Sequence, residues 1–254
     1  HDFAGGTVVH INAAVAALII VLIIGKRKGF GVEPMRPHNV PFVMLGAFLL
    51  WFGWFGFNAG SAFAANGVAG YAWVSTSLAA AAAMLTWGFT EKIRTGHYTA
   101  MGAASGIVAG LVAITPAADV VSPIWAIVLG AIAGVVTCLA CSLKFKLGYD
   151  DSLDVVGVHG VGGLVGTVLL GFFMEGTGLF YSGKWNQLGV QLIIAIIAIA
   201  FSAVITTIIA FALEKTIGWR VTQAQEVAGI DLADQGERAY DFAGTASSVI
   251  REMK

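Results

Sequence analysis

Long apolar stretches alternate with short polar connections along almost the whole chain. Seven stretches approach the roughly 20 residues that a helix needs to cross a bilayer core. They cover approximately residues 3–24, 41–64, 69–90, 99–118, 124–143, 155–174 and 187–213. The second and third are separated by little more than Asn66-Gly67, a turn signal. This pattern predicts an all-α polytopic membrane protein with about seven transmembrane helices.

Composition supports this class. The chain is 57% hydrophobic and only 11% charged, with a mean hydropathy of +0.83, whereas soluble domains carry about 25% charged residues. Its 33 glycines, with many alanines, suit helices that pack closely through small residues. A net charge of -1 gives no sign of a nucleic-acid-binding surface. Cys138 and Cys141 lie within an apolar run, which favours helix packing over redox or metal chemistry.

Basic residues recur in every second connection between the apolar runs. They are Lys26, Arg27, Lys28 and Arg36, then Lys92 and Arg94, then Lys144 and Lys146, and finally Lys215 and Arg220. The intervening connections hold only Lys184. Because positive residues gather on the cytoplasmic side, we expect residue 1 outside and the C-terminus inside, in a cell inner or plasma membrane.

Two apolar runs share a pattern in which an aspartate precedes a histidine set among glycines and branched aliphatic residues. The first run has Asp2 and His10, and the sixth has Asp154 and His159. Both aspartates are predicted as helix N-caps. The runs lie five apart and therefore cross the membrane in opposite directions, which is typical of an inverted-topology repeat. A five-helix repeat unit would place four further helices before His1.

His10 and His159 lie deep in their predicted helices, about 12 Å and about 7–8 Å from the respective aspartates. An ionisable residue inside a membrane is costly to bury and often marks a functional site. Two neutral imidazoles can relay a proton or bind a small polar solute, because each ring has one donor and one acceptor nitrogen. A histidine that merely bonds across a helix interface is the plainer alternative. His38 and His97 fall in predicted cytoplasmic connections and are weaker candidates.

An aromatic segment precedes a serine in the second run. Phe57 and Ser61 are four residues apart and therefore share one helical face. The face of an aromatic ring attracts a cation, and a hydroxyl can accept a hydrogen bond from it. Aromatic packing against lipid or neighbouring helices is an equally open interpretation.

Five long motifs carry a resemblance to a known family. They are DFAGGTVVHIN at 2–12, WFGWFGFNAGSA at 51–62, SGIVAGLVAITPA at 105–117, DVVGVHGVGG at 154–163 and RVTQAQEVAGIDLADQGERAY at 220–240. Together they resemble the ammonium transporter family, the Amt/Mep/Rh superfamily. The resemblance implies two inverted five-helix repeats plus a final helix, eleven in all, assembled as a homotrimer with one pore per subunit.

On that fold the chain runs from the fifth helix to the end. The implied divisions are 1–26 for the last helix of the first repeat, 27–186 for the second repeat, 187–217 for the final helix and 218–254 for a cytoplasmic regulatory tail. The tail would contact a signal protein of the PII family. Gln235 departs from the family, since relatives often have a histidine there, and this puts details of regulation in doubt.

The resemblance also implies roles for individual residues. His10 and His159 match the twin histidines of the pore, Phe57 a gating phenylalanine, Ser61 a hydroxyl of the outer recruitment site, Trp54 a residue of the lower pore and Asp2 an aspartate that orders the recruitment site. A second gating phenylalanine and a recruiting tryptophan would belong to the other half of the fold. No enzymatic activity, cofactor or metal is implied.

The expected function is ammonium transport, with methylammonium as an analogue, by deprotonation outside and conduction of ammonia past the histidines. Two other classes are open on the sequence. A haem protein would use the two histidines as axial ligands, but none of the apolar runs contains an arginine for the propionates. An ammonium sensor of the same fold would signal through a cytoplasmic partner or domain.

Overall fold

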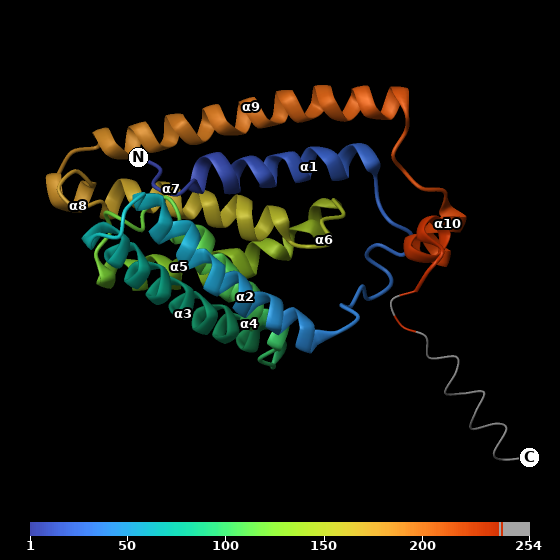
Figure 1. Cartoon of the computed structure of the whole chain (residues 1–254), viewed down its shortest axis with the longest axis horizontal. Coiled ribbons are helices and arrows are strands. Elements are labelled where there is room, and N and C mark those ends of the chain that lie inside the picture. The colour runs from blue at the N-terminus through green and yellow to red at the C-terminus, as the bar shows by residue number, and fades with distance from the viewer. Residues whose placement is uncertain (239, 241–254) are drawn as a thin grey trace, which may run out of the picture.

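A computed structural model describes residues 1–238 and 240. All regular elements in this part of the chain are helices, and it contains no β-strand. Its elements are η1 (Gly6–Ile11), α1 (Asn12–Ile24), α2 (Val40–Asn58), η2 (Ala59–Ala62), α3 (Gly67–Thr95), α4 (Ala100–Ile114), α5 (Pro123–Cys141), α6 (Leu143–Leu147), η3 (Val156–Val161), α7 (Gly162–Phe173), α8 (Leu179–Ser182), α9 (Asn186–Thr216), α10 (Gln223–Ala228) and η4 (Asp231–Gln235). In Figure 1, α1 and α9 run side by side along the molecule, and α2, α3 and α4 are inclined to them.

Six helical segments of the described part are long and apolar enough to cross a membrane. The seventh predicted run, 99–118, forms the shorter helix α4 of 15 residues, about 22 Å long at 1.5 Å per residue. It ends early because Pro116 has no N–H to continue the ladder, and the chain turns from Thr115 onward. α4 is buried along its second half, from Gly106 except for Val108, so its length is not set by contact with lipid.

Polar residues between the apolar runs start the helices. Asn39, Asn66 and Thr99 each accept a backbone N–H from three residues ahead, at the N-termini of α2, α3 and α4. Such caps satisfy amides that the helix itself leaves free. The Asn66-Gly67 pair therefore begins α3, after the short 3₁₀-helix η2 has reversed the chain.

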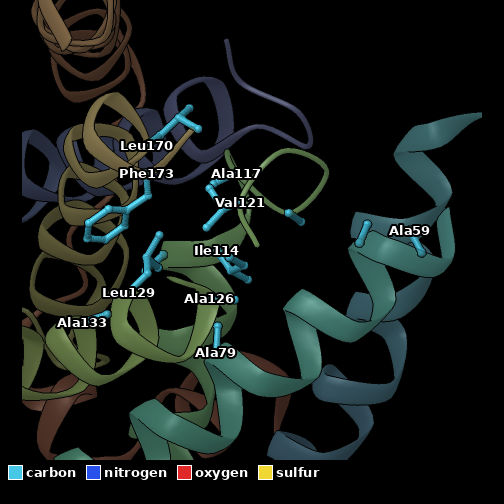
Figure 2. Close-up of a cluster of buried hydrophobic side chains, with 13 residues drawn as sticks. Ala59, Ala79, Ile114, Ala117, Val121, Ala126, Leu129, Ala133, Leu170 and Phe173 are labelled. Carbon is cyan, nitrogen blue, oxygen red and sulfur yellow. The ribbon is translucent and has the colours of Figure 1, made fainter. Parts of the chain in front are cut away.

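Small residues let the central helices approach closely. A methyl group on Gly130 or Gly134 of α5 would lie 2.2 Å from the carbonyl oxygen of Ala79 or 2.4 Å from that of Ala83, both in α3. Gly110 of α4 meets the same face of α3. Figure 2 shows the cluster of buried side chains beside this contact, in which alanines from α3 and α5 meet Leu129, Leu170 and other larger residues. The small-residue packing predicted from composition is confirmed.

The two cysteines of the CxxC pattern are free thiols within this packing. Cys138 lies in a buried hydrophobic cluster. The Sγ atom of Cys141 faces Gly157, where a methyl group would come within 2.5 Å of it. Helix packing therefore accounts for both residues.

The connections rich in basic residues gather at the end of the molecule that carries α10, and the N-terminus and α8 lie at the other end (Figure 1). This arrangement follows from helices that alternate in direction. It gives the molecule two chemically different ends.

Candidate functional site

Each candidate histidine lies in a short π-helical segment that continues directly into an α-helix. His10 belongs to η1, which leads into α1, and His159 belongs to η3, which leads into α7. π-Helical turns are rare and are frequently found at functional sites. The two predicted repeats therefore share an irregular helix geometry as well as a sequence pattern.

An aspartate stabilises the start of η1 by accepting backbone amides. One carboxylate oxygen of Asp2 accepts the N–H groups of Thr7 and Val8, at 3.1 and 3.2 Å. The capping role predicted for Asp2 is thereby confirmed. It is exerted across a loop of three residues, 3–5, rather than from the position directly before the helix.

The cap of η3 is Asp151, and the prediction that Asp154 fills this role is wrong. The Asp151 carboxylate accepts the N–H groups of Val155 and Val156, at 3.0 and 2.7 Å. Asp154 has a left-handed backbone with φ of 58°, and its carboxylate binds Lys144 Nζ at 2.8 Å. The backbone turn at Asp154 directs its side chain to Lys144, which leaves the amides to Asp151.

With Asp151 as the cap of η3, the two histidine-bearing segments match more closely. His10 follows its capping aspartate, Asp2, by eight residues, and His159 follows Asp151 by the same number. The sequence contained this signal, because Asp151 stands at the matching spacing. The more conspicuous likeness between the Asp2 and Asp154 motifs obscured it.

Glycines bring the two histidine-bearing segments together. A methyl group on Gly163 of α7 would lie 3.0 Å from the Gly6 carbonyl oxygen and 3.2 Å from Cβ of His10. A methyl group on Gly160 would lie 2.8 Å from Cβ of Ala14 in α1. At the same crossing the hydroxyls of Thr7 and Thr167 are 3.3 Å apart. Larger side chains at Gly160 and Gly163 would push α7 and η3 away from η1 and α1.

The imidazoles of His10 and His159 contact each other directly. Their Nδ1 atoms are 3.2 Å apart and their ring centroids 5.2 Å apart. A hydrogen bond at this distance requires one Nδ1 to carry the proton and the other to accept it. His10 is 3% exposed, and its Nε2 is buried without a hydrogen-bond partner among the described residues.

Aromatic rings form the wall beside His10. Trp54 stacks on the His10 ring at 5.3 Å and 15°, and Phe57 meets it edge-on at 6.2 Å and 87°. The aromatic pocket here has a volume of about 470 Å³ and is lined by Val9, His10, Gly46, Leu49, Leu50, Gly53, Trp54 and Phe57. Apart from His10 and the buried indole of Trp54, its lining offers hydrocarbon and aromatic surface.

A second, larger pocket reaches His159 from the end of the molecule that carries α10. This basic pocket has a volume of about 700 Å³. Its charged lining residues are Arg27, Arg36, Lys144 and Asp154, and it also contains Ser105, Ser152 and His159. It shares Gly46 and Leu50 of α2 with the aromatic pocket. The histidine pair therefore lies where an apolar pocket and a charged pocket adjoin.

Two predicted site residues lie outside the aromatic pocket. Ser61 donates its hydroxyl proton to the Phe57 carbonyl oxygen at 2.8 Å, so that its lone pairs are left to accept. Asp2 acts through the start of η1, and its second carboxylate oxygen is buried without a partner among the described residues. Neither residue is among those that line the aromatic pocket.

An ion pair that the sequence patterns did not indicate holds the loop before η3. Arg27 binds Asp150 with its backbone N–H, its Nε and its Nη2, at 2.8, 2.9 and 2.6 Å. Burial alone would raise the pKa of Asp150, but the hydrogen bonds from Arg27 lower it below its ordinary value overall. The connection after α1 is thus fastened to the loop that carries the Asp151 cap.

The beginning of the predicted tail binds the same connection. Arg220 donates to the carbonyl oxygens of Ile24 and Lys26 and to the Glu226 carboxylate, at 2.6, 2.7 and 3.0 Å. Glu226 accepts the Lys28 N–H at 2.7 Å. Residues 239 and 241–254 of the predicted tail lie outside the described residues.

Comparison with known proteins identifies the family. The sequence model of the Ammonium Transporter Family matches residues 1–240. An ammonium transporter of Mycobacterium tuberculosis is 55% identical over 261 aligned positions, which cover 98% of this chain and 55% of the relative. The chain therefore spans about half the length of the curated relatives it matches.

Solved structures agree with this result. A protein described as a sensor Amt protein superimposes with a TM-score of 0.84 and 33% identity, over 92% of this chain and 60% of that one. Candida albicans Mep2 superimposes with a TM-score of 0.82 and 37% identity, over 88% of this chain and 53% of the other. The predicted transporter fold is confirmed for the part that this chain represents.

Proposed function

The chain belongs to the ammonium transporter family, and on this premise we propose that it forms part of a pore that carries ammonia across a membrane past His10 and His159. The observation that supports the proposal most strongly is the position of the histidine pair. It lies between an aromatic pocket and a basic pocket, and one buried ring nitrogen of the pair has no hydrogen-bond partner in the described part of the chain.

The apolar lining of the aromatic pocket favours neutral ammonia over ammonium. Moving an isolated ion from water into a low-dielectric site costs tens of kcal/mol on idealised estimates. Removing a proton from a lysine-like amine at pH 7 costs only about 5 kcal/mol, given a pKa near 10.4. Deprotonation before entry is therefore the cheaper route.

The residues near the pocket divide the work. Phe57 presents an aromatic surface that attracts the cation, and Ser61 offers lone pairs to an ammonium N–H. Asp2 holds the start of η1, and Trp54 packs the His10 ring in place. Ammonia then exchanges hydrogen bonds with the imidazoles on its way to the basic pocket.

The arrangement in the cell follows the same proposal. The end that carries α10 is cytoplasmic, because the basic connections gather there. Residues 1–26 complete the first repeat, 27–186 form the second, 187–217 form the final helix and 218–254 form the regulatory tail. The protein assembles as a homotrimer, and the tail binds a PII-family signal protein. A pull-down by the cognate PII protein that succeeds equally well without residues 220–254 would disprove that role of the tail.

Replacing each histidine by leucine in the full-length gene product tests the conduction pathway. We expect His10→Leu and His159→Leu to change methylammonium flux, or the charge that accompanies it, by at least tenfold, the size of about 1.4 kcal/mol in a barrier. Flux and current would be measured in proteoliposomes. His97→Leu is the control, since His97 is an exposed histidine in the connection between α3 and α4. Unchanged flux and current in both pore variants would refute the pathway.

An ammonium sensor is the second candidate, and the superposition on a protein described as a sensor Amt protein supports it. A sensor would bind ammonium at the same site and change the conformation of its cytoplasmic segment. The same flux measurement separates the two. Saturable ammonium binding without any flux in the wild-type protein would favour the sensor.

A further inference from the structure

The indole of Trp54 is fixed by a buried hydrogen bond to Thr115. Trp54 Nε1 lies 3.0 Å from Thr115 Oγ1, and the two residues are 8% and 0% exposed. Thr115 Oγ1 also lies 2.7 Å from the Leu111 carbonyl oxygen, to which it donates its only proton. The hydroxyl must therefore accept from Trp54, whose indole nitrogen can only donate.

The backbone of Thr115 belongs to the same junction. Its carbonyl oxygen accepts the Ala4 N–H at 3.1 Å, and the neighbouring Pro116 carbonyl accepts the Phe3 N–H at 3.1 Å. Thr115 thus links α2, the end of α4 and the segment that leads from Asp2 into η1. These three parts of the chain meet around the His10 ring.

Trp54 in turn limits the orientation of His10. The two rings are nearly parallel, 15° apart. The imidazole is also held by its Nδ1 bond to His159 and by the edge-on contact with Phe57. A tilt of the indole would open the stack and allow His10 to rotate away from His159.

We propose that Thr115 is a positioning residue for conduction: it holds the Trp54 ring flat against His10, so that His10 keeps Nδ1 on His159 and Nε2 free for the solute. The proposal rests on the proposed function, since it assigns a role in the passage of ammonia past His10. Thr115 itself does not line the aromatic pocket and acts through Trp54.

Isosteric replacement isolates this hydrogen bond. Thr115→Val keeps the shape of the side chain but leaves a buried indole N–H without an acceptor, so Trp54 must turn to find one. An indole N–H without an acceptor makes the wild-type orientation of Trp54 less populated, by a factor on the order of ten, and we expect ammonia flux to fall by a similar factor. Thr115→Ser keeps the oxygen and should retain most of the wild-type flux.

Thr137 provides the matched control. It is also 0% exposed, lies in a packed helix and donates to a carbonyl oxygen four residues earlier, that of Ala133, at 2.6 Å. In the described part of the chain, no side chain donates to it. Thr137→Val therefore reproduces the loss of a buried threonine hydroxyl without releasing a tryptophan.

Two measurements on the full-length gene product test the proposal. The first is the indole N–H resonance of Trp54 in protein labelled with ¹⁵N-tryptophan, identified by its disappearance in Trp54→Phe. The second is ammonia flux in proteoliposomes. We expect Thr115→Val to shift the resonance and lower the flux, while Thr115→Ser and Thr137→Val resemble the wild type in both.

The outcomes separate this proposal from the one on which it rests. An unshifted Trp54 resonance in Thr115→Val, or a flux equal to that of Thr137→Val, would overturn the positioning role. A wild-type protein without flux would overturn the proposed function instead, and this would be known before any variant is compared.

Discussion

The two histidines occupy equivalent places in two similar helix entries, but their surroundings differ. His10 is almost fully buried between Trp54 and Phe57 and faces the aromatic pocket. His159 is partly exposed and faces the basic pocket, where Lys144 pairs with Asp154. The backbone device is shared: an aspartate cap, a π-helical segment and a histidine eight residues after the aspartate.

The difference teaches that the two matching helix entries supply geometry and the neighbouring helices supply chemistry. Trp54 and Phe57 come from α2, and Lys144 comes from α6. A solute between the histidines would leave an apolar pocket on one side and enter a polar one on the other.

The largest expected effect comes from breaking the crossing that brings the two halves together. Gly163→Ala places a methyl group 3.0 Å from a backbone carbonyl oxygen and 3.2 Å from Cβ of His10, so α7 and η1 have to move apart by a few tenths of an ångström. Overpacking of this kind costs about 1–3 kcal/mol. We expect a lower unfolding temperature in detergent and a loss of flux larger than the stability loss explains.

Gly70→Ala is the control for that substitution. Gly70 is also helical, but a methyl group there meets no atom within 4 Å in the described structure. Alanine should therefore stabilise α3 by about 0.5–1 kcal/mol through its helix propensity. If Gly163→Ala proved as harmless as Gly70→Ala, the close crossing would not be what joins the histidines.

A smaller effect on stability should distinguish Asp151 from Asp154, the two aspartates before η3. Asp151→Ala removes the acceptor of two part-buried amides and should cost about 1–2 kcal/mol, as the loss of a helix N-cap does. Asp154→Asn should cost less than about 1 kcal/mol, because it loses one partly exposed ion pair and asparagine tolerates the left-handed backbone. Hydrogen exchange of the Val155 and Val156 amides measures the difference. Equal protection in the two variants would contradict the assignment of the cap to Asp151.

The fold could be predicted from the sequence because its main signal is the length and spacing of apolar runs. Each predicted apolar run forms a helix or most of one in the structure. The exception, α4, ends at Ile114 instead of continuing through Pro116. Where residues on both sides of a proline are apolar, hydropathy alone does not reveal where the helix ends.

The site was predictable only in part. His10, His159, Trp54 and Phe57 stand out by residue type, and the structure brings all four together. The roles of Thr115 and Lys144 depend on contacts between residues 61 and 10 positions apart. No local sequence pattern predicts such contacts, since a buried threonine in an apolar helix usually bonds only to a backbone carbonyl of the same helix.

The smallest expected effect concerns the two ion pairs that fasten the ends of the first helical segment. At the end that precedes η1, His1 Nε2 lies 2.8 Å from the Asp119 carboxylate, and this hydrogen bond raises the pKa of His1 against the opposing effect of burial. At the other end, Arg27 holds Asp150, whose pKa is lowered. The His1 pair should therefore lose its contribution to stability as pH rises, and the Asp150 pair should lose its contribution only as pH falls.

The signs follow from the directions of the two shifts. A raised pKa means that the His1 pair stabilises fully below the unfolded value of about 6.5 and is lost as pH rises through the folded value. The lowered pKa of Asp150 means that its pair is present above about 3.9 and is lost only in acid. From pH 6 to pH 9 the unfolding temperature should thus fall slightly, by the equivalent of at most about 1 kcal/mol for one partly exposed pair. Asp119→Asn should remove this slope, whereas Asp150→Asn should lower the unfolding temperature and leave the slope. A wild-type slope in Asp119→Asn would show that the pair at this end does not respond to pH.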